Sequence, residues 1–224
     1  FRRVLFRSSG KTEVYLHLFE KTLKEGKTGL FLLPEISLTP QLVNRFAKRF
    51  GSKIALLHSQ LTDRERTQFW WEMITGEKQI LIGARSALFC PVPNLGLIVV
   101  DEEHESSFKQ EEKLKYHGRD VAIMLAKEMN CPIVLGSATP SFESWVNATK
   151  GKFKLHRMVK RVGDIQLPEI KIIDLKESAA RSKELKLPFW MSETLHTELQ
   201  SNLENSFQSA LFLNRRGKIG RAHV

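Results

Sequence analysis

The chain has 224 residues, of which 42% are hydrophobic and 27% are charged, and its formal net charge is +10. This describes a soluble globular protein of one sizeable domain, or of a domain plus part of another, and no apolar run approaches the roughly 20 residues that span a bilayer. The positive charge favours an anionic partner such as nucleic acid and gives no reason to expect a membrane partner.

The first part of the chain alternates helical and strand patterns as far as Pro140. Such alternation predicts an α/β fold with a mostly parallel sheet. Thr39-Pro40 is a strong helix start, with a hydroxyl N-cap and proline at the first helical position. We predict helices at 12–25, 40–50, 63–75 and 119–129, and strands at 29–33, 54–57, 80–82, 97–100 and 133–135.

The composition of the sequence changes after Pro140. Residues 150–186 are rich in Lys, Arg and single aliphatic residues, which indicates a connector with one strand near 170–175. A helix is predicted at 192–204. A further strand is predicted at 210–213, just before Asn-Arg-Arg-Gly.

A glycine, a lysine and a threonine open the first helix. Ser9-Gly10-Lys11-Thr12 matches the end of the phosphate-binding loop G-x-x-x-x-G-K-[ST]. In such a loop the helix N–H groups bind phosphate, Lys11 bridges the β- and γ-phosphates, and Thr12 holds Mg²⁺. The loop's first glycine is missing, and the same four residues also fit a lysine-capped helix start.

Three adjacent carboxylates and an imidazole follow the apolar strand at 97–100. Asp101, Glu102 and Glu103 repel one another unless a cation or a catalytic task compensates. A strand ending in Asp-Glu is typical of a Walker B motif, in which Asp101 would hold Mg²⁺ and Glu102 would polarise the attacking water. The alternative is a solvated acidic loop, but the upstream Gly-Lys-Thr favours phosphoryl chemistry.

A small, hydroxylated segment, Gly-Ser-Ala-Thr-Pro-Ser, follows the strand at 133–135. Parallel strands end at one edge of a sheet, so Ser137 and Thr139 are expected near Asp101. They could hydrogen-bond the Asp-Glu-Glu-His side chains and relay their state. Taken alone, the segment is more typical of an ordinary Gly/Ser/Pro turn.

These three segments, in this order, resemble motifs I, II and III of superfamily 2 helicases. Further segments narrow the resemblance to the PriA family of primosomal replication-restart helicases, and it covers about residues 9–217. Among them are PEISLTPQ, LHSQLTDRER, YHGRDVA and LFLNRRG. The resemblance implies a RecA-like parallel sheet flanked by helices, followed by the start of a second lobe. It also implies ATP-dependent, 3′ to 5′ DNA unwinding in replication restart at stalled forks.

The resemblance assigns further roles to individual residues. Thr39, Arg85 and Ser86 would contact DNA phosphates, although a simple turn and a surface charge explain them equally. Phe108 and Tyr116 would stack on bases and Lys109 would pair with a phosphate, whereas Phe89 is expected in the core. His104 would sense nucleotide and communicate with Ser137 and Thr139.

The implied cofactors are ATP and Mg²⁺, with zinc bound only by a C-terminal part that the chain does not include. Cys90 and Cys131 form no CxxC pair, which indicates reduced thiols in a cytosolic protein. The implied partners are single-stranded and forked DNA, single-stranded DNA-binding protein and other primosome proteins, in the bacterial cytoplasm. Two alternatives stay open: another superfamily 2 translocase, RecG-like or restriction-type, and a non-catalytic nucleic-acid-binding NTPase-like module.

Both ends of the chain are expected to be foreign. Back-translated, residues 1–8 and 219–224 match a common sequencing adapter and its reverse complement, and such ends are left out of fold reasoning. Without their four arginines the net charge falls from +10 to +6. The expected organisation is a first lobe at 9–150, a connector with lobe-edge elements at 151–205 and the start of a second lobe at 206–218.

Overall fold

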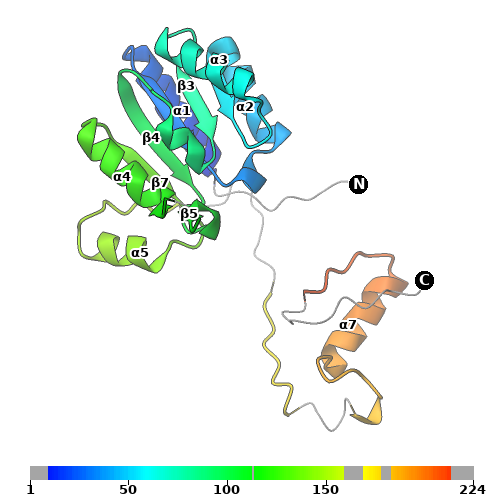
Figure 1. The fold of residues 1–224 in the computed structure, drawn as a ribbon. Coiled ribbons are helices and arrows are strands. Elements are labelled where there is room, and N and C mark those ends of the chain that lie inside the picture. The colour runs from blue at the N-terminus through cyan, green and yellow to red at the C-terminus, as the bar shows by residue number, and fades with distance from the viewer. Residues whose placement is uncertain (1–9, 113, 159–168, 178–182, 213–224) are drawn as a thin grey trace. The chain divides into compact units, whose positions relative to one another are not determined.

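The computed structural model describes residues 10–112, 114–158, 169–177 and 183–212. They belong to two compact units, one within residues 1–165 and one within 166–224, which can be followed by colour in Figure 1. No helix in the described ranges is long and apolar enough to cross a membrane.

A five-stranded parallel sheet forms the centre of the first unit (Figure 1). Its strand order is β2-β3-β1-β4-β7, so β1 is the central strand and pairs with β3 on one side and β4 on the other. The predicted α/β fold with a parallel sheet is therefore confirmed. The strands are β1 Thr28–Leu32, β2 Ile54–Leu57, β3 Ile80–Gly83, β4 Leu95–Asp101 and β7 Ile133–Gly136. The helices are α1 Lys11–Lys24, α2 Pro40–Phe50, α3 Asp63–Ile74, α4 Gly118–Glu128 and α5 Phe142–Thr149.

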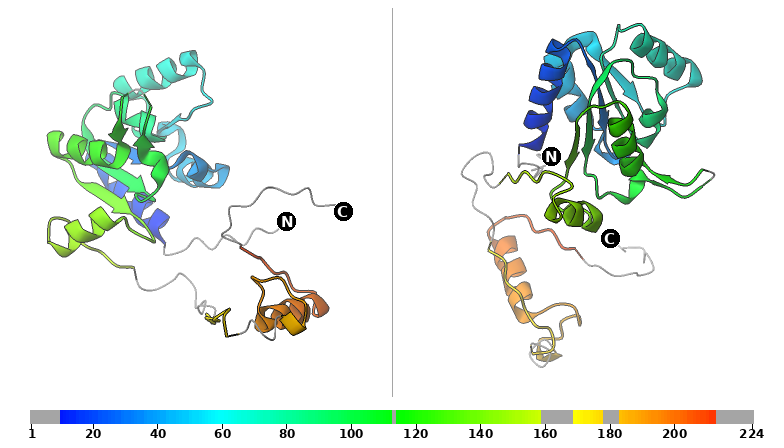
Figure 2. Two further views of the ribbon diagram at one scale, coloured as in Figure 1. Left: turned by 60° about the horizontal axis from the view of Figure 1, so that its bottom comes forward. Right: turned by 90° about the vertical axis from the view of Figure 1, so that its left-hand side faces the viewer.

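Helices cover both faces of this sheet. Side chains alternate along a strand, so in β1 Phe31 faces one apolar cluster while Leu30 and Leu32 face the other. The first cluster includes side chains of α1 and α2, and the second includes side chains of α3 and α4. The right-hand view of Figure 2 shows the sheet between α1 and α4. Burial on both faces explains why the strands read as continuous apolar runs.

Local signals set the helix boundaries where the sequence predicts them. Thr39 caps α2 through a hydrogen bond from the Leu42 N–H, and Thr62 and Glu65 form a capping box at α3. Gly26, Gly51 and Gly76, with φ of 69°, 59° and 80°, follow α1, α2 and α3. Each adopts a positive φ that other residues resist.

Several short elements of the first unit were not predicted from the sequence. They are the 3₁₀ turns η1 Glu35–Ser37, η2 Gly51–Lys53, η3 Arg85–Phe89 and η4 Ser106–Phe108, the helix α5, and a two-stranded antiparallel hairpin of β5 Lys109–Gln110 and β6 Tyr116–His117. Each spans eight residues or fewer, too short for a periodic apolar pattern to identify it.

The second unit contains α7, Glu193–Glu204, which confirms the helix predicted at 192–204. Ser192 caps it by accepting from the Leu195 N–H. The strand predicted near 170–175 is wrong, and 210–212 is not a strand either. A strand needs a neighbour for its backbone groups, and neither segment pairs with one among the described residues. Leu213 and the following Asn-Arg-Arg-Gly lie outside the described residues.

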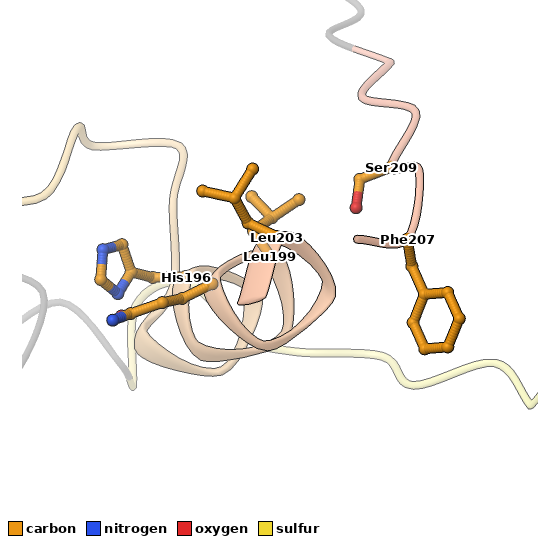
Figure 3. Close-up of a pocket in the computed structure, with 6 residues that line it drawn as sticks. His196, Leu199, Leu203, Phe207 and Ser209 are labelled. Atoms are coloured by element: carbon orange, nitrogen blue, oxygen red, sulfur yellow. The ribbon is translucent and has the colours of Figure 1, made fainter. Parts of the chain in front are cut away.

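A pocket of about 470 Å³ lies within the second unit, between α7 and the segment that follows it (Figure 3). Most of its lining is apolar or uncharged: His196, Leu199, Gln200, Leu203, Phe207 and Ser209. None of these residues is among the predicted site residues. The predicted site residues that the structure describes all lie in the first unit.

Candidate functional site

Motif residues far apart in the sequence meet at the carboxyl-terminal edge of the sheet. Asp101 ends β4, and its register partner on β7 is Gly136. Lys11, the first residue of α1, places its Nζ 2.9 Å from Glu102 Oε1 and 3.4 Å from Asp101 Oδ1. Three of the predicted catalytic residues, Lys11, Asp101 and Glu102, therefore lie together. The lysine charge offsets the repulsion between the two carboxylates.

Tyr15 fixes one of these carboxylates. Its hydroxyl donates to Asp101 Oδ1 at 3.0 Å, while its ring is buried and packs against Phe31. Burial, and then the negative charge of Asp101, raise the pKa of the Tyr15 hydroxyl far above its usual range. The hydroxyl therefore stays a donor. Gly136 leaves the room for it, because a Cβ at that position would overlap the tyrosine hydroxyl.

His104 contacts both hydroxyl side chains predicted to face it. Its Nδ1 lies 2.8 Å from Ser137 Oγ and its Nε2 lies 3.3 Å from Thr139 Oγ1. The Thr139 N–H donates to Ser137 Oγ at 2.9 Å, so the turn is also held from within. The predicted hydrogen bonds between this turn and the Asp-Glu-Glu-His segment are present. Glu102 has a φ of 49°, an uncommon backbone conformation of the kind that gathers at functional sites.

The start of α1 suits a phosphate group. Gly10 occupies the N-cap position with a φ of 76°, and among the described residues no side chain caps the helix there. The helix therefore presents backbone N–H groups and the positive end of its dipole beside Lys11 and Thr12. Ser9, predicted to share this site, lies outside the described residues.

Carboxylate and hydroxyl oxygens close to this helix start also suit Mg²⁺. This ion is commonly held by one or two protein oxygens together with substrate phosphates. Thr12 and Asp101 are the residues predicted for that role, and Asp101 lies within reach of the Lys11 ammonium. Within the described ranges no group of three His, Cys, Asp or Glu side chains forms a metal site of protein ligands alone.

The residues predicted to contact DNA lie on several different elements of the first unit. Thr39 caps α2, and Ser86 is exposed on η3. Arg85 donates through Nη1 to the carbonyl oxygens of Ser107 and Lys109, at 3.0 and 2.6 Å. Arg85 therefore ties η3 to the segment that contains η4 and β5. Exposed Lys109 pairs with Glu111 at 2.6 Å.

One predicted DNA-contacting residue is wrong. Phe108 is only 1% exposed and belongs to the apolar cluster beneath α3 and α4, so its ring cannot stack on a base in this conformation. Phe89, expected in the core, is instead 53% exposed and meets the Tyr116 ring edge-on at 5.3 Å. The two phenylalanines exchange their expected places, because η4 turns the first one inward.

Comparison with known proteins decides the family. A family model described as "DEAD/DEAH box helicase" matches residues 7–147, more than half of the chain. The chain belongs to the DEAD/DEAH box helicase family.

The chain also has relatives that confirm the resemblance drawn from its motifs. It is 46% identical over 209 residues to the replication restart protein PriA of Bacillus subtilis and 46% identical over 209 residues to that of Haemophilus influenzae. These matches cover 93% of this chain but only 26% and 28% of the relatives, so the chain spans about a quarter of their length. A solved structure of RecG bound to a three-way DNA junction gives a TM-score of 0.44 at 23% identity, over 63% of this chain and 18% of that one.

Two polar residues of the site were not predicted from the sequence. Tyr15 reads as one more apolar residue of α1, although it follows Lys11 by four positions and so lies on the same helix face. Glu103 reads as the third of three exposed acids, yet it is 1% exposed. The alternation of side chains past the end of β4 is the one signal that could have placed Glu103 inward.

Proposed function

We propose that this chain is the first motor lobe, with the start of the second, of an ATP-dependent DNA helicase of the PriA type. Such an enzyme would unwind DNA in the 3′ to 5′ direction at stalled forks during replication restart. The observation that carries the proposal is the meeting of Lys11 with Asp101 and Glu102 at one sheet edge, in a helicase-family chain whose relatives are PriA proteins.

The arrangement supports a division of roles among the site residues. Bound Mg·ATP supplies the phosphoryl group that is transferred to water. Lys11 and the N–H groups at Gly10, and at Ser9 outside the described residues, would hold the phosphates. Thr12 and Asp101 would hold the Mg²⁺, and Glu102 would orient and polarise the attacking water.

His104 would report the state of this site to neighbouring segments. Its two ring nitrogens contact Ser137 and Thr139, so a movement of Glu102 or His104 would be passed to the turn after β7. We propose that Ser137 and Thr139 couple hydrolysis to DNA movement.

The DNA contacts would come from η3, α2 and the β5–β6 hairpin. Thr39 lies at a helix start where backbone N–H groups favour phosphate. Ser86 and Lys109 are exposed, and Arg85 keeps guanidinium nitrogens beyond the Nη1 that holds the hairpin. Tyr116 offers a ring for base stacking.

The wider setting follows from the PriA type. We propose single-stranded and forked DNA as ligands, and single-stranded DNA-binding protein and other primosome proteins as partners, in the bacterial cytoplasm. Zinc would be bound only by a C-terminal part beyond the residues of this chain. We also propose that the boundaries at 9–150, 151–205 and 206–218 separate the first lobe, the connector and the start of the second lobe.

A non-catalytic NTPase-like module is disfavoured, because such a module would not need both Lys11 and Glu102 in contact. The deciding experiment measures ATP hydrolysis and unwinding by the full-length protein that contains this chain. We expect single-stranded DNA to stimulate hydrolysis and duplexes with 3′ tails to be unwound. Hydrolysis indifferent to DNA would contradict the motor, and a preference for 5′ tails would contradict the PriA type.

A further inference from the structure

Glu103 is a buried carboxylate directly beside the proposed catalytic pair. It is 1% exposed, and the structure gives its two oxygens four donors. Oε1 accepts from the Ser141 N–H at 2.7 Å. Oε2 accepts from Ser141 Oγ at 3.0 Å, from Ser144 Oγ at 2.9 Å and from Arg119 Nη1 at 3.2 Å. A charge this deep is tolerated only when it is paired and hydrogen-bonded.

The donors to Glu103 come from two different helices. Arg119 lies in the first turn of α4, whereas Ser141 is the N-cap of α5 and Ser144 lies in its first turn. The Ser141 hydroxyl uses its whole capacity, because it donates to Glu103 and accepts from Arg119 Nη1 at 2.6 Å and from the Ser144 N–H at 3.2 Å. One side chain at the end of β4 therefore fastens the starts of α4 and α5.

The charges around this network are complementary. The Arg119 guanidinium lies beside the Glu103 carboxylate, with Nη1 3.2 Å from Oε2. Arg119 is buried, and its Nε also donates to Oδ1 of exposed Asp120 at 2.8 Å. The salt bridge between Arg119 and Glu103 therefore combines opposite charges with directional hydrogen bonds.

The same network borders the turn at residues 137–141 on both sides. The Glu103 N–H donates to the Gly136 carbonyl oxygen at 3.1 Å, while its side chain holds Ser141. The residues between them, Ser137 and Thr139, are those that contact His104. We propose that Glu103 is a positioning residue that locks the 137–141 turn and the start of α5 against the end of β4, and so keeps Ser137 and Thr139 within reach of His104.

Amide hydrogen exchange of the 224-residue chain tests the lock without any reference to catalysis. Glu103→Gln replaces one accepting oxygen by an N–H₂ donor. This donor would face groups that also donate, and neither the Arg119 guanidinium nor the Ser141 N–H can accept a hydrogen bond instead. We expect exchange at the first turn of α5 and at 137–141 to rise about tenfold or more, since hydrogen bonds to charged groups are among the stronger ones. Exposed Glu112→Gln is the matched control and should leave exchange there unchanged.

A second pair of variants tests the same proposal if Glu103→Gln fails to fold. Ser144→Ala removes one donor at a helical position that favours alanine, and Ser144→Thr retains the hydroxyl. We expect faster exchange at 137–141 with alanine and near wild-type exchange with threonine. Equal exchange in the two, or an unchanged turn in a folded Glu103→Gln, would overturn the lock.

The effect on turnover rests on the proposed function and is measured in the full-length protein. A positioning loss should lower kcat for DNA-stimulated ATP hydrolysis about tenfold in Ser144→Ala while KM for ATP changes little, because neither Glu103 nor Ser144 is among the proposed phosphate ligands. Threonine should restore kcat. A rise in KM alone would contradict the positioning role. Absence of hydrolysis by the wild-type protein would contradict the proposed function and leave the exchange result to decide the lock.

Discussion

Asp101 and Glu102 are adjacent, yet their surroundings differ. Asp101 is held by Tyr15 and lies near Lys11, whereas Glu102 contacts Lys11 and approaches His104 Nδ1 at 3.8 Å. In the full-length protein, Asp101→Asn should weaken binding of Mg·ATP, and Glu102→Gln should leave nucleotide bound but unhydrolysed. Equilibrium binding of a fluorescent ATP analogue and steady-state hydrolysis separate the two. Wild-type hydrolysis by Glu102→Gln would show that this carboxylate does not activate water.

Tyr15 allows a finer test of the same site. Tyr15→Phe keeps the buried ring but removes the hydroxyl that orients Asp101. We expect the Mg²⁺ concentration needed for half-maximal hydrolysis to rise about tenfold or more, since a hydrogen bond to a charged group is worth about 1.5–3 kcal/mol. Thr22→Val, near the opposite end of α1 from the site, is a control that also removes a buried hydroxyl. An unchanged Mg²⁺ requirement would mean that Asp101 needs no such support.

Among the elements, η4 and the β5–β6 hairpin place one aromatic ring in the core and another, half-buried, nearer the surface. Phe108 is fully buried beside α4, and its ring lies close to Gly118. Phe108→Ala should therefore destabilise the chain by about 3–5 kcal/mol, as large-to-small core changes do. Chemical denaturation of the 224-residue chain measures this loss. A change below about 1 kcal/mol would mean that the ring is not part of the core.

Tyr116 should behave in the opposite way. Tyr116→Ala removes a half-buried ring that packs on exposed Phe89, so it should cost less stability than Phe108→Ala. Stacking is worth about 1–3 kcal/mol per base, so tenfold weaker apparent affinity for single-stranded DNA is expected in the full-length protein. The readout is DNA-stimulated hydrolysis against basal hydrolysis. Equal losses in both rates would place Tyr116 among the structural residues instead.

Elements with a local cause were predictable from the sequence. Helix boundaries are an example. The N-caps Thr39 and Thr62 mark the starts of α2 and α3, and a glycine follows each of α1, α2 and α3. The hairpin and η4 depend on Arg85 reaching two carbonyl groups more than 20 residues away, and no local pattern carries that contact. The strand predicted near 170–175 failed for the related reason that propensity supplies no partner strand.

The candidate site follows the same rule. The meeting of Lys11 with Asp101 and Glu102 was predictable, because the residue types and their order in the motifs indicate it. Glu103 was not, since its role depends on donors from α4 and α5 that meet only in the folded chain.

The whole molecule sets a limit on activity, because the chain spans about a quarter of its PriA relatives. We expect this chain alone not to be an active motor. The phosphate-loop pattern places its first glycine five positions before Gly10, where the sequence has Leu5. A second lobe would also contribute an arginine to the ATP site, and such a residue can raise turnover by on the order of 10³-fold or more.

Weak binding of single-stranded DNA should persist without turnover. A net charge of +6 remains when the four arginines of the terminal segments are left out, and each phosphate contact lowers log K by about 0.7 per decade of salt for single strands. Fluorescence anisotropy at two salt concentrations measures this slope. The same chain is then compared, in DNA-stimulated hydrolysis, with a version that restores the loop glycine and adds the second lobe. Comparable turnover by the two proteins would refute the requirement for two lobes.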